Sequence, residues 1–321
     1  MPNIAILFQT TSTTPMVLRE NHLDMIRSHN PDGDVRVFET EEELLSAKFD
    51  AEILFSWGRI TPNGYCNSCT NLRWIHSISA GAEGIMALDA AKPPMIITKM
   101  ADVHGVPMSE HTMCYILSFL RRFPQSYSNQ RAHIWDKSKA NLLDECQNKT
   151  VAIIGIGGIG SEVARKCKAF DMRVIGCRRT PKPMEFVDEM YPVAELKTVL
   201  GQADFVVCLV PHTPESEGMF DKAMFKLMKP SAIFINIGRG KVVDTSALID
   251  ALQRGVIAGA ALDALEPEPL ETDSPLWDME NVIISPHCSA DSPYYFDRGI
   301  PMMCENLDKF LKGEPMKHRI L

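Results

Sequence analysis

The sequence predicts an α/β protein built from two doubly wound parallel-sheet domains. Short apolar runs alternate with amphipathic stretches along the whole chain, which is the pattern of parallel strands covered by helices. The 321 residues are enough for two domains of ordinary size, and the 45% of apolar residues is enough to fill their cores. A glycine-rich turn that begins at Gly155, between an apolar run and an amphipathic stretch, is typical of one such domain.

Five strands are expected in the first hundred residues. Their apolar runs are Ile4–Phe8, Val35–Phe38, Ile53–Phe55, Trp74–Ser77 and Met95–Thr98. A long helix should follow from about Met108 to Phe123, because Arg121 and Arg122 place cations where its C-terminus would lie. A polar stretch, Gln125 to Lys149, then leads to a strongly apolar strand.

The second half of the chain repeats strands and helices. Six strands are expected at Thr150–Ile154, Arg173–Cys177, Phe205–Val210, Ala232–Asn236, Ile257–Leu262 and Val282–Ser285. Helices are expected near Ile159–Phe170, Leu196–Leu200, Lys222–Met228, Thr245–Arg254 and, in the tail, Ser292–Leu311. Six strands at this spacing favour a doubly wound nucleotide-binding domain.

Composition narrows the class of protein. A formal net charge of −8 argues against a general binder of nucleic acid. The nine cysteines are an odd number without regular spacing, which favours free thiols in a reducing compartment and hence a cytoplasmic protein. Cys66 and Cys69 form a lone CxxC, which without a second pair argues against a metal site and leaves their role open. We expect no signal peptide, no membrane span and no membrane partner.

The glycine-rich turn predicts a dinucleotide site. Residues 155–160 read GIGGIG, after a strand and before a helix, which is the context that the GxGxxG pattern requires. Gly155 permits the tight turn, Gly157 lets the backbone approach a diphosphate, and Gly160 lets the helix pack closely on the strand. The anion would bind the amides at the helix N-terminus. The expected cofactor contacts in this turn are Gly155, Ile156, Gly157, Gly158, Ile159 and Gly160.

The end of the next strand favours NADP(H) over NAD(H), although NAD(H) stays possible. An NAD site usually carries an acidic residue about 20 residues past the turn, where it binds the ribose 2′-hydroxyl. Here the sequence reads Arg178, Arg179 and Thr180, and two guanidinium groups can hold a 2′-phosphate. The alternative is a pair of solvated surface arginines.

Three ionisable residues follow three strands of the second half. Arg239, Glu268 and His287 can converge, because ligands of open parallel sheets bind at the carboxyl ends of the strands. Reduction of a 2-oxo acid needs a hydride at the carbonyl carbon and a proton at its oxygen. His287 can donate the proton, Glu268 can orient the imidazole, and Arg239 can bind the substrate carboxylate and polarise the ketone. Taken singly, each is as easily explained as a solvated loop residue or a turn residue.

The segment from Asp204 to Asp244 resembles the signature region of the D-isomer-specific 2-hydroxyacid dehydrogenases. GAALDALEPEPL, the downstream ISPH and the GIGGIG turn resemble that family too, so the similarity covers essentially the whole chain. The resemblance implies that Arg239, Glu268 and His287 are the catalytic residues. Glu268, rather than Glu266, precedes the final proline of its motif, and Asp263 matches a position that contacts the nicotinamide carboxamide. Further cofactor contacts are expected at Val210, Pro211, Thr213, Ile237 and Gly238.

The resemblance also implies the domain organisation. A flavodoxin-like substrate domain would comprise residues 1–101 and 288–321, with a Rossmann cofactor domain at 102–287 between them. The long helix near Met108–Phe123 would belong to a homodimer interface. The substrate would contact the loop of Ser79, Ala80, Gly81 and Ala82 through backbone amides, and also Trp57, which resembles a tryptophan of the glyoxylate/hydroxypyruvate reductase branch. A core position for Trp57 is about equally expected.

Other functions are compatible with the same motifs. The 2-oxo acid could be glyoxylate, hydroxypyruvate or a bulkier analogue, since Cys288, Ser289 and Ala290 after the histidine assign no side chain. A dehydrogenase of formate or phosphite would keep the fold. A nucleotide-sensing scaffold, like the transcriptional corepressors that share this fold, would keep the coenzyme site without turnover.

Overall fold

The structure is a computed structural model that describes residues 1–9, 15–57, 60, 62–138 and 140–321. The chain divides into two compact units, each of which is described by itself. Unit 1 comprises Met1–His104 and Asp291–Leu321, and unit 2 comprises Gly105–Ala290. These boundaries lie a few residues from those expected from the sequence, 101/102 and 287/288. The roles assigned there to the two domains stay predictions at this point.

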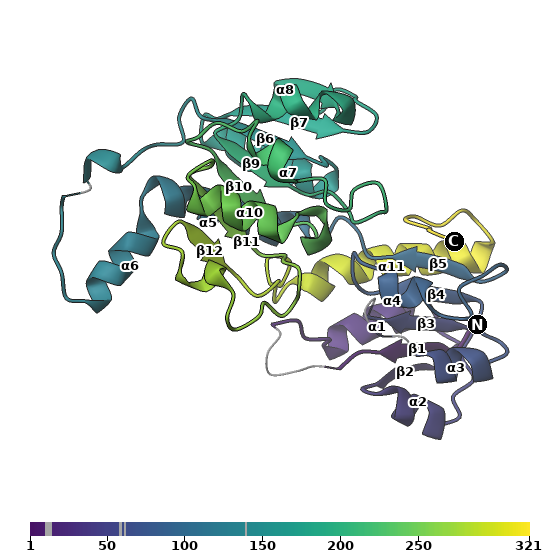
Figure 1. Ribbon diagram of the computed structural model, residues 1–321. Coiled ribbons are helices and arrows are strands. Elements are labelled where there is room, and N and C mark those ends of the chain that lie inside the picture. Colours follow the sequence, from purple (N-terminus) through teal and green to yellow (C-terminus); the bar gives the residue numbers. More distant parts are fainter. Residues whose placement is uncertain (10–14, 58–59, 61, 139) are drawn as a thin grey trace. The chain divides into compact units, whose positions relative to one another are not determined.

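Unit 1 is built on a five-stranded parallel sheet in the order β2-β1-β3-β4-β5. Its strands are β1 (Ile4–Leu7), β2 (Val35–Phe38), β3 (Ile53–Ser56), β4 (Trp74–Ser77) and β5 (Ile96–Lys99). This order is the flavodoxin-like one, in which the chain reverses its winding direction after the second strand. Its helices are α1 (Glu20–Ser28), α2 (Glu41–Ser46), α3 (Asn63–Ser68), α4 (Glu83–Met86) and α11 (Tyr295–Lys312) (Figure 1).

Both faces of this sheet are buried, which explains why its strands read as continuous apolar runs. Ile4 and Ile6 of β1 point into one core, which α11 shares through Ile300. Ala5 and Leu7 alternate with them and point into the other core. Successive side chains of a strand face opposite sides, so each apolar run serves two cores.

Unit 2 is built on a seven-stranded parallel sheet in the order β12-β11-β10-β9-β6-β7-β8. Its strands are β6 (Thr150–Ile154), β7 (Arg173–Arg178), β8 (Glu189–Pro192), β9 (Phe205–Cys208), β10 (Ile233–Asn236), β11 (Gly259–Leu262) and β12 (Val282–Ile284). The chain winds outward from β6 through β7 to β8, then returns to place β9 on the other side of β6. A doubly wound sheet binds its ligand at such a reversal point, outside the carboxyl ends of the strands.

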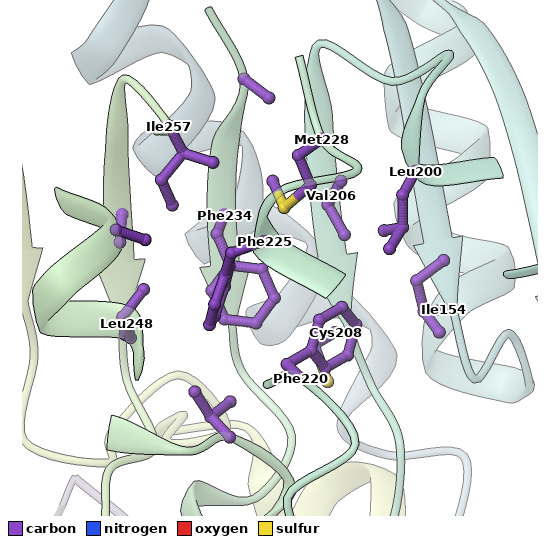
Figure 2. Packing of buried hydrophobic residues seen from close by; sticks show 14 of the residues in the cluster. Ile154, Leu200, Val206, Cys208, Phe220, Phe225, Met228, Phe234, Leu248 and Ile257 are labelled. Atoms are coloured by element: carbon purple, nitrogen blue, oxygen red, sulfur yellow. The ribbon is translucent and has the colours of Figure 1, made fainter. Parts of the chain in front are cut away.

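Helices cover both faces of this sheet as well. They are α5 (Gly105–Leu120), α6 (Phe123–Arg131), α7 (Gly158–Ala169), α8 (Leu196–Leu200), α9 (Lys222–Phe225) and α10 (Thr245–Gln253), with 3₁₀ turns η1 (Ala140–Leu142), η2 (Val193–Glu195), η3 (Gly240–Val242) and η4 (Pro275–Asp278). In one core Phe220 and Phe225 pack on Phe234 of β10, beside Leu248 and Ile257 (Figure 2). The other core lies under α5 and α7.

The predicted fold class is confirmed, and the differences are local. The long helix ends at Leu120 instead of Phe123, because Arg122 adopts a left-handed conformation with φ of 52°, and the separate helix α6 then begins inside the stretch expected to be irregular. Strand β8 was not expected from the sequence. It is an edge strand whose four residues are all half-buried, so it lacks the apolar run that marks the inner strands.

Several element ends also differ from the expectation. The strand expected to reach Val210 ends at Cys208, the strand expected from Ile257 begins at Gly259, and the helix expected near Lys222–Met228 ends at Phe225. The tail helix begins at Tyr295 instead of Ser292. Terminal residues of an element are poorly specified by periodicity, because the apolar pattern continues into the adjoining turn.

Candidate active site

The glycine turn after β6 has the geometry that a diphosphate site requires. Gly155 has φ of +85°, and a Cβ on it would lie 2.9 Å from the backbone of Leu209 and Val210, so only glycine fits. A Cβ on Gly160 would lie 2.8 Å from the side chain of Ile156 in the turn and 3.2 Å from that of Ile153 in β6, which shows how closely α7 packs on the sheet. A Cβ on Gly157 would meet nothing within 4 Å, so there is room in front of the N-terminus of α7. Because the N-cap residue, Gly157, carries no side chain, the first amides of the helix stay available to an anion.

Other expected cofactor contacts lie around this turn. Val210, Pro211 and Thr213 follow β9, which is paired with β6, and Gly238 packs against the carbonyl oxygen of Val210. Within the turn, the two isoleucines differ in exposure. Ile159 is half-buried, whereas Ile156 is only 2% exposed, as is Ile237 after β10. Ile156 and Ile237 therefore offer a ligand their backbone groups and not their side chains.

The arginine pair lies at the end of β7, as expected from the sequence. Arg178 is half-buried, and its Nη1 atom lies 3.7 Å from the Sδ atom of Met184, whereas Arg179 and Thr180 are exposed. The structure adds an acidic neighbour from a different loop. The pKa of the Glu215 carboxyl is lowered by its hydrogen bond with Thr213 and, to a smaller extent, by the positive charge of Arg179. Sequence reasoning missed Glu215, because it searched for acidic residues only along the segment after Arg178.

Glu268 and His287 are in direct contact. The Nδ1 atom of His287 lies 2.8 Å from Oε2 and 3.0 Å from Oε1 of Glu268, and Oε1 also accepts a hydrogen bond from the backbone N–H of Leu265. Because a carboxylate only accepts hydrogen bonds, Nδ1 carries the hydrogen of this contact. The Nε2 atom of His287 is then the one positioned to exchange a proton with a substrate.

Arg239 belongs to a segment that packs on the Glu268 loop. A Cβ on the next residue, Gly240, would collide with the carbonyl oxygen of Leu265, so these two segments touch through their backbones. Asn236 joins them again, because its Nδ2 donates to the carbonyl oxygens of Arg239 and Ala264. The Nη1 atom of Arg239 donates to the carbonyl oxygen of Gly238. The structure thus places all three expected catalytic residues at the carboxyl edge of one sheet.

Asp263 has a structural role that the sequence did not indicate. It is 2% exposed, its Oδ1 accepts from the hydroxyl of Ser285 and from the amide of Cys288 at 2.9 Å, and its Oδ2 accepts from the amide of Ser289 at 3.0 Å. These donors lie on both sides of His287. Asp263 therefore anchors the loop that carries the histidine, while its contact with a nicotinamide stays a prediction.

In unit 1 the loop after β4 makes a tight turn that two serine side chains stabilise. Ser77 and Ser79 both donate from Oγ to the carbonyl oxygen of Gly81, at 2.8 and 2.7 Å. Ala80 and Gly81 are half-buried, and Ala82 is buried. The hydroxyl of Tyr295 on α11 donates to the carbonyl oxygen of Ile78 at 2.6 Å, which fixes the start of the loop.

Trp57 lies close to the same tyrosine. Its ring centroid is 6.1 Å from that of Tyr295 and 5.9 Å from that of Phe8, and the residue is half-buried. Trp57 is thus neither wholly in the core nor wholly exposed, in keeping with the two alternatives that the sequence left open.

Two kinds of feature are absent from the part of the chain that the structure describes. Within residues 1–9, 15–57, 60, 62–138 and 140–321, no group of three or more His, Cys, Asp and Glu side chains is arranged to hold a metal ion. Over those same residues, no helix is both long and apolar enough to cross a bilayer.

The chain is similar in sequence to proteins of a known family. The model of the D-isomer specific 2-hydroxyacid dehydrogenase NAD binding domain matches residues 113–289. The glyoxylate reductase of Thermococcus gammatolerans is 34% identical over 311 residues, which cover 92% of this chain and 91% of that protein. That of Pyrococcus furiosus is 32% identical over 308 residues, with coverages of 92% and 90%.

Solved structures align with nearly the whole chain. The NADPH-dependent glyoxylate/hydroxypyruvate reductase of Sinorhizobium meliloti, in complex with NADP and sulfate, has a TM-score of 0.81 and 26% identity, and the alignment covers 99% of this chain and 98% of that one. A D-isomer specific 2-hydroxyacid dehydrogenase of Xanthobacter autotrophicus, in complex with NADPH and MES, has a TM-score of 0.82, 26% identity and coverages of 100% and 98%.

The chain belongs to the D-isomer-specific 2-hydroxyacid dehydrogenase family. It is accordingly an oxidoreductase of 2-oxo acids with a nicotinamide cofactor, as the resemblance of its motifs implied.

Proposed function

We propose that this enzyme uses NADPH to reduce a small 2-oxo acid, such as glyoxylate or hydroxypyruvate, to the D-2-hydroxy acid. The contact between Glu268 and His287 carries the proposal, because it occupies Nδ1 and leaves Nε2 of His287 to exchange a proton with a substrate. The relatives named glyoxylate reductase support this choice of substrate. The experiment is to follow the absorbance of NADPH and of NADH with glyoxylate, hydroxypyruvate, pyruvate and phenylpyruvate. If none of the four 2-oxo acids causes consumption of NADPH or NADH, the proposal is rejected.

Each catalytic side chain has one part in the reaction. A bound nicotinamide supplies a hydride for the carbonyl carbon of the substrate. Arg239 binds the substrate carboxylate with its planar fork of donors and draws electron density from the adjacent carbonyl oxygen. His287 gives the proton on Nε2 to that oxygen, and Glu268 holds the ring by its Nδ1–H so that Nε2 keeps its direction. In the reverse reaction His287 takes the proton from the hydroxyl group.

The residues of the glycine turn and of the arginine pair form the proposed coenzyme site. The amides at the N-terminus of α7 bind the diphosphate, in the room left at Gly157. Arg178 and Arg179 bind the 2′-phosphate, and the complexes of relatives with NADP and NADPH support this preference. Glu215 opposes it in part, since its negative charge lies near Arg179. We therefore expect a preference for NADPH and not an absolute requirement.

The loop after β4 supplies the proposed binding site for the substrate carboxylate. Ser79, Ala80, Gly81 and Ala82 would present backbone amides to it, and Trp57 would limit the size of the substrate side chain. Because a large aromatic ring would leave little room for a substrate side chain, Trp57 favours a small 2-oxo acid such as glyoxylate. The hydroxyls of Ser77 and Ser79 both donate to the carbonyl oxygen of Gly81, so the loop makes a tight turn. Such a turn supports this assignment, because consecutive amides of a tight turn can face one anion.

A homodimer is the proposed assembly. Between residues 123 and 143, six large apolar side chains are exposed: Phe123 (47%), Tyr127 (62%), Ile134 (55%), Trp135 (92%), Leu142 (52%) and Leu143 (42%). Figure 1 shows α6 extending away from the sheet of unit 2. Exposed apolar side chains mark protein interfaces where they gather on one surface, and in a symmetric dimer each copy would cover those of the other.

A further inference from the structure

A partly buried, hydrogen-bonded cluster adjoins the loop of His287. Asp263 follows β11 and Ser285 follows β12, and these strands are adjacent and parallel, with Leu262 paired to Ile284. The hydroxyl of Ser285 contacts Asp263 Oδ1, the hydroxyl of Tyr115 at 2.5 Å and the Nε2 atom of His111 at 3.2 Å. Three distant parts of the chain therefore meet at one serine oxygen.

The hydrogen atoms of this cluster have one consistent arrangement. Asp263 already accepts from two backbone N–H groups, and Ser285 can give it one more hydrogen. The oxygen of Ser285 then has two lone pairs, which accept from the O–H of Tyr115 and from the Nε2–H of His111. Each hydrogen bond of the cluster thereby has one donor and one acceptor.

Burial keeps the two donors of α5 in their neutral forms. The pKa of Tyr115 is raised by burial, so the phenol keeps its hydrogen. The pKa of His111 is lowered by burial, with a smaller opposite effect of Asp263, so the imidazole stays uncharged. Tyr115 and His111 are four residues apart on α5. Their rings are in edge-to-face contact, with the ring centroids 4.6 Å apart. They act as one fixed support for the serine.

Through Asp263, this cluster fixes the backbone before and after His287. His287 has φ of 52°, a left-handed conformation that is strained for a non-glycine residue and persists only where its surroundings hold it. Ser285 precedes it and is held by its hydroxyl. Cys288 and Ser289 follow it and are held by their amides. The strained residue is therefore fixed between two anchored ends, and its ring is directed at Glu268.

We propose that Ser285, supported by Tyr115 and His111, is a positioning residue that acts through Asp263 to hold His287 in its catalytic orientation. The proposal rests on the function proposed above for His287, and it assigns to one face of α5 a part in proton transfer. Sequence reasoning could not find it, because Tyr115 and Ser285 are separated by 170 positions in the chain.

The test uses the full chain with Ser285→Ala and Tyr115→Phe, each of which removes one hydroxyl, and with Ser285→Thr, which keeps it. We expect kcat for the 2-oxo acid to fall about 10-fold to 100-fold in Ser285→Ala and less in Tyr115→Phe, with Ser285→Thr near wild type and the KM of the coenzyme unchanged. The matched control is Ser109→Ala, which removes a buried hydroxyl of α5 that donates to the carbonyl oxygen of Val106 and should leave kcat unchanged.

A double-mutant cycle separates positioning from general stabilisation. If Ser285 acts through His287, Ser285→Ala costs nothing further in a His287→Ala background, because the group that it positions is gone. An equal fold-loss of kcat in both backgrounds would overturn the proposal. Should Ser285→Ala fail to fold, the same cycle is run with Tyr115→Phe, which leaves the serine and the aspartate in place.

Chemical modification of His287 tests the positioning role of Ser285 without turnover, and therefore separately from the proposed function. Diethyl pyrocarbonate modifies uncharged imidazoles, and mass spectrometry follows the rate at His287. We expect that rate to rise at least about threefold in Ser285→Ala, because the ring is released from Glu268. A rate equal to that of the wild type would overturn the positioning role, even in an enzyme that reduces 2-oxo acids. A wild-type protein that consumes no 2-oxo acid would reject the proposed function alone.

Discussion

Oε2 of Glu268 and Nδ1 of His287 lie 2.8 Å apart, although the two residues follow different strands of the sheet. The carboxylate also accepts from the amide of Leu265, so the peptide chain fixes its direction before any substrate binds. A base held in this way keeps one nitrogen occupied and presents the other to the substrate. This relationship defines the proposed role of both residues better than their presence in a motif.

The arginine pair predicts a change of coenzyme preference. Arg178→Asp should raise the KM of NADPH about 10-fold to 100-fold and alter that of NADH far less, because only NADPH carries the 2′-phosphate that a guanidinium binds. Glu215→Gln should act in the opposite direction and lower the KM of NADPH, since it removes a negative charge near Arg179. Steady-state kinetics with both coenzymes measure both effects. Equal changes for NADPH and NADH in Arg178→Asp would contradict this role.

Tyr295 predicts a separate effect on substrate binding. Its hydroxyl donates to the carbonyl oxygen of Ile78 and contacts Nε2 of His104 at 2.9 Å, so Tyr295→Phe should loosen the loop after β4. We expect the KM of the 2-oxo acid to rise several-fold while kcat changes little. Tyr65→Phe is the matched control, because Tyr65 is also buried in unit 1 and donates to a backbone carbonyl, that of Phe49. A KM that rises equally in both variants would point to general loosening of unit 1.

His76 predicts a dependence of stability on pH. The ring is fully buried on β4, its Nδ1 lies 2.7 Å from the hydroxyl of Thr98, and its Nε2 has no hydrogen-bond partner among the residues that the structure describes. Burial, with a smaller effect of His318, lowers the pKa of His76 from 6.5 to about 3. The folded protein therefore accommodates only the neutral ring. Above pH 6.5 the ring is neutral in both the folded and the unfolded chain. As the pH falls from 6.5 towards 3, only the unfolded chain binds a proton at His76, so the free energy of unfolding falls by about 1.4 kcal/mol for each pH unit.

The variant His76→Gln tests this dependence, because glutamine does not titrate. Urea unfolding at pH 6.5, 5.5 and 4.5 should show a shallower loss of stability with falling pH in His76→Gln than in the wild type. His133→Gln, which replaces an exposed histidine, should keep the slope of the wild type. An unchanged slope in His76→Gln would show that the ring does not govern acid lability.

Trp135 predicts the assembly state. Trp135→Glu should convert the proposed dimer into single chains, because it places a charge among the exposed apolar side chains that we assign to the dimer interface. Sedimentation velocity measures the mass directly. Trp277→Glu is the matched control, since Trp277 is also an exposed tryptophan of unit 2, at 52%, but is not among those side chains. A wild-type protein that sediments as one chain would contradict the dimer.

Most of the fold could be predicted because buried parallel strands are continuous apolar runs. Strands such as Val35–Phe38, Trp74–Ser77 and Thr150–Ile154 agree with their expected bounds for this reason. The edge strand β8 could not be predicted, since an edge strand packs on one side only and needs no such run. Helix α6 could not either, because its nine residues are polar on average and none is buried.

The candidate site divides in the same way. Local motifs located Gly155, Arg239, Glu268 and His287, because each follows a strand and strands of a parallel sheet end at one edge. The contacts of Ser285 with Tyr115 and of Arg179 with Glu215 are made between distant segments, and no local spacing reports them. The anchoring role of Asp263 was missed because its partners are mostly backbone amides, which carry no sequence signal.

The most direct test of the central claim is the rate of NADPH consumption with glyoxylate for the wild type, His287→Ala and Glu268→Gln, with coenzyme binding measured in parallel by NADPH fluorescence. Glu266→Gln is the matched control, because Glu266 lies on the same loop and is exposed. We predict that His287→Ala loses at least about 100-fold in kcat and Glu268→Gln about 10-fold to 100-fold, while Glu266→Gln and coenzyme binding are unchanged. Undiminished turnover in His287→Ala would contradict the account.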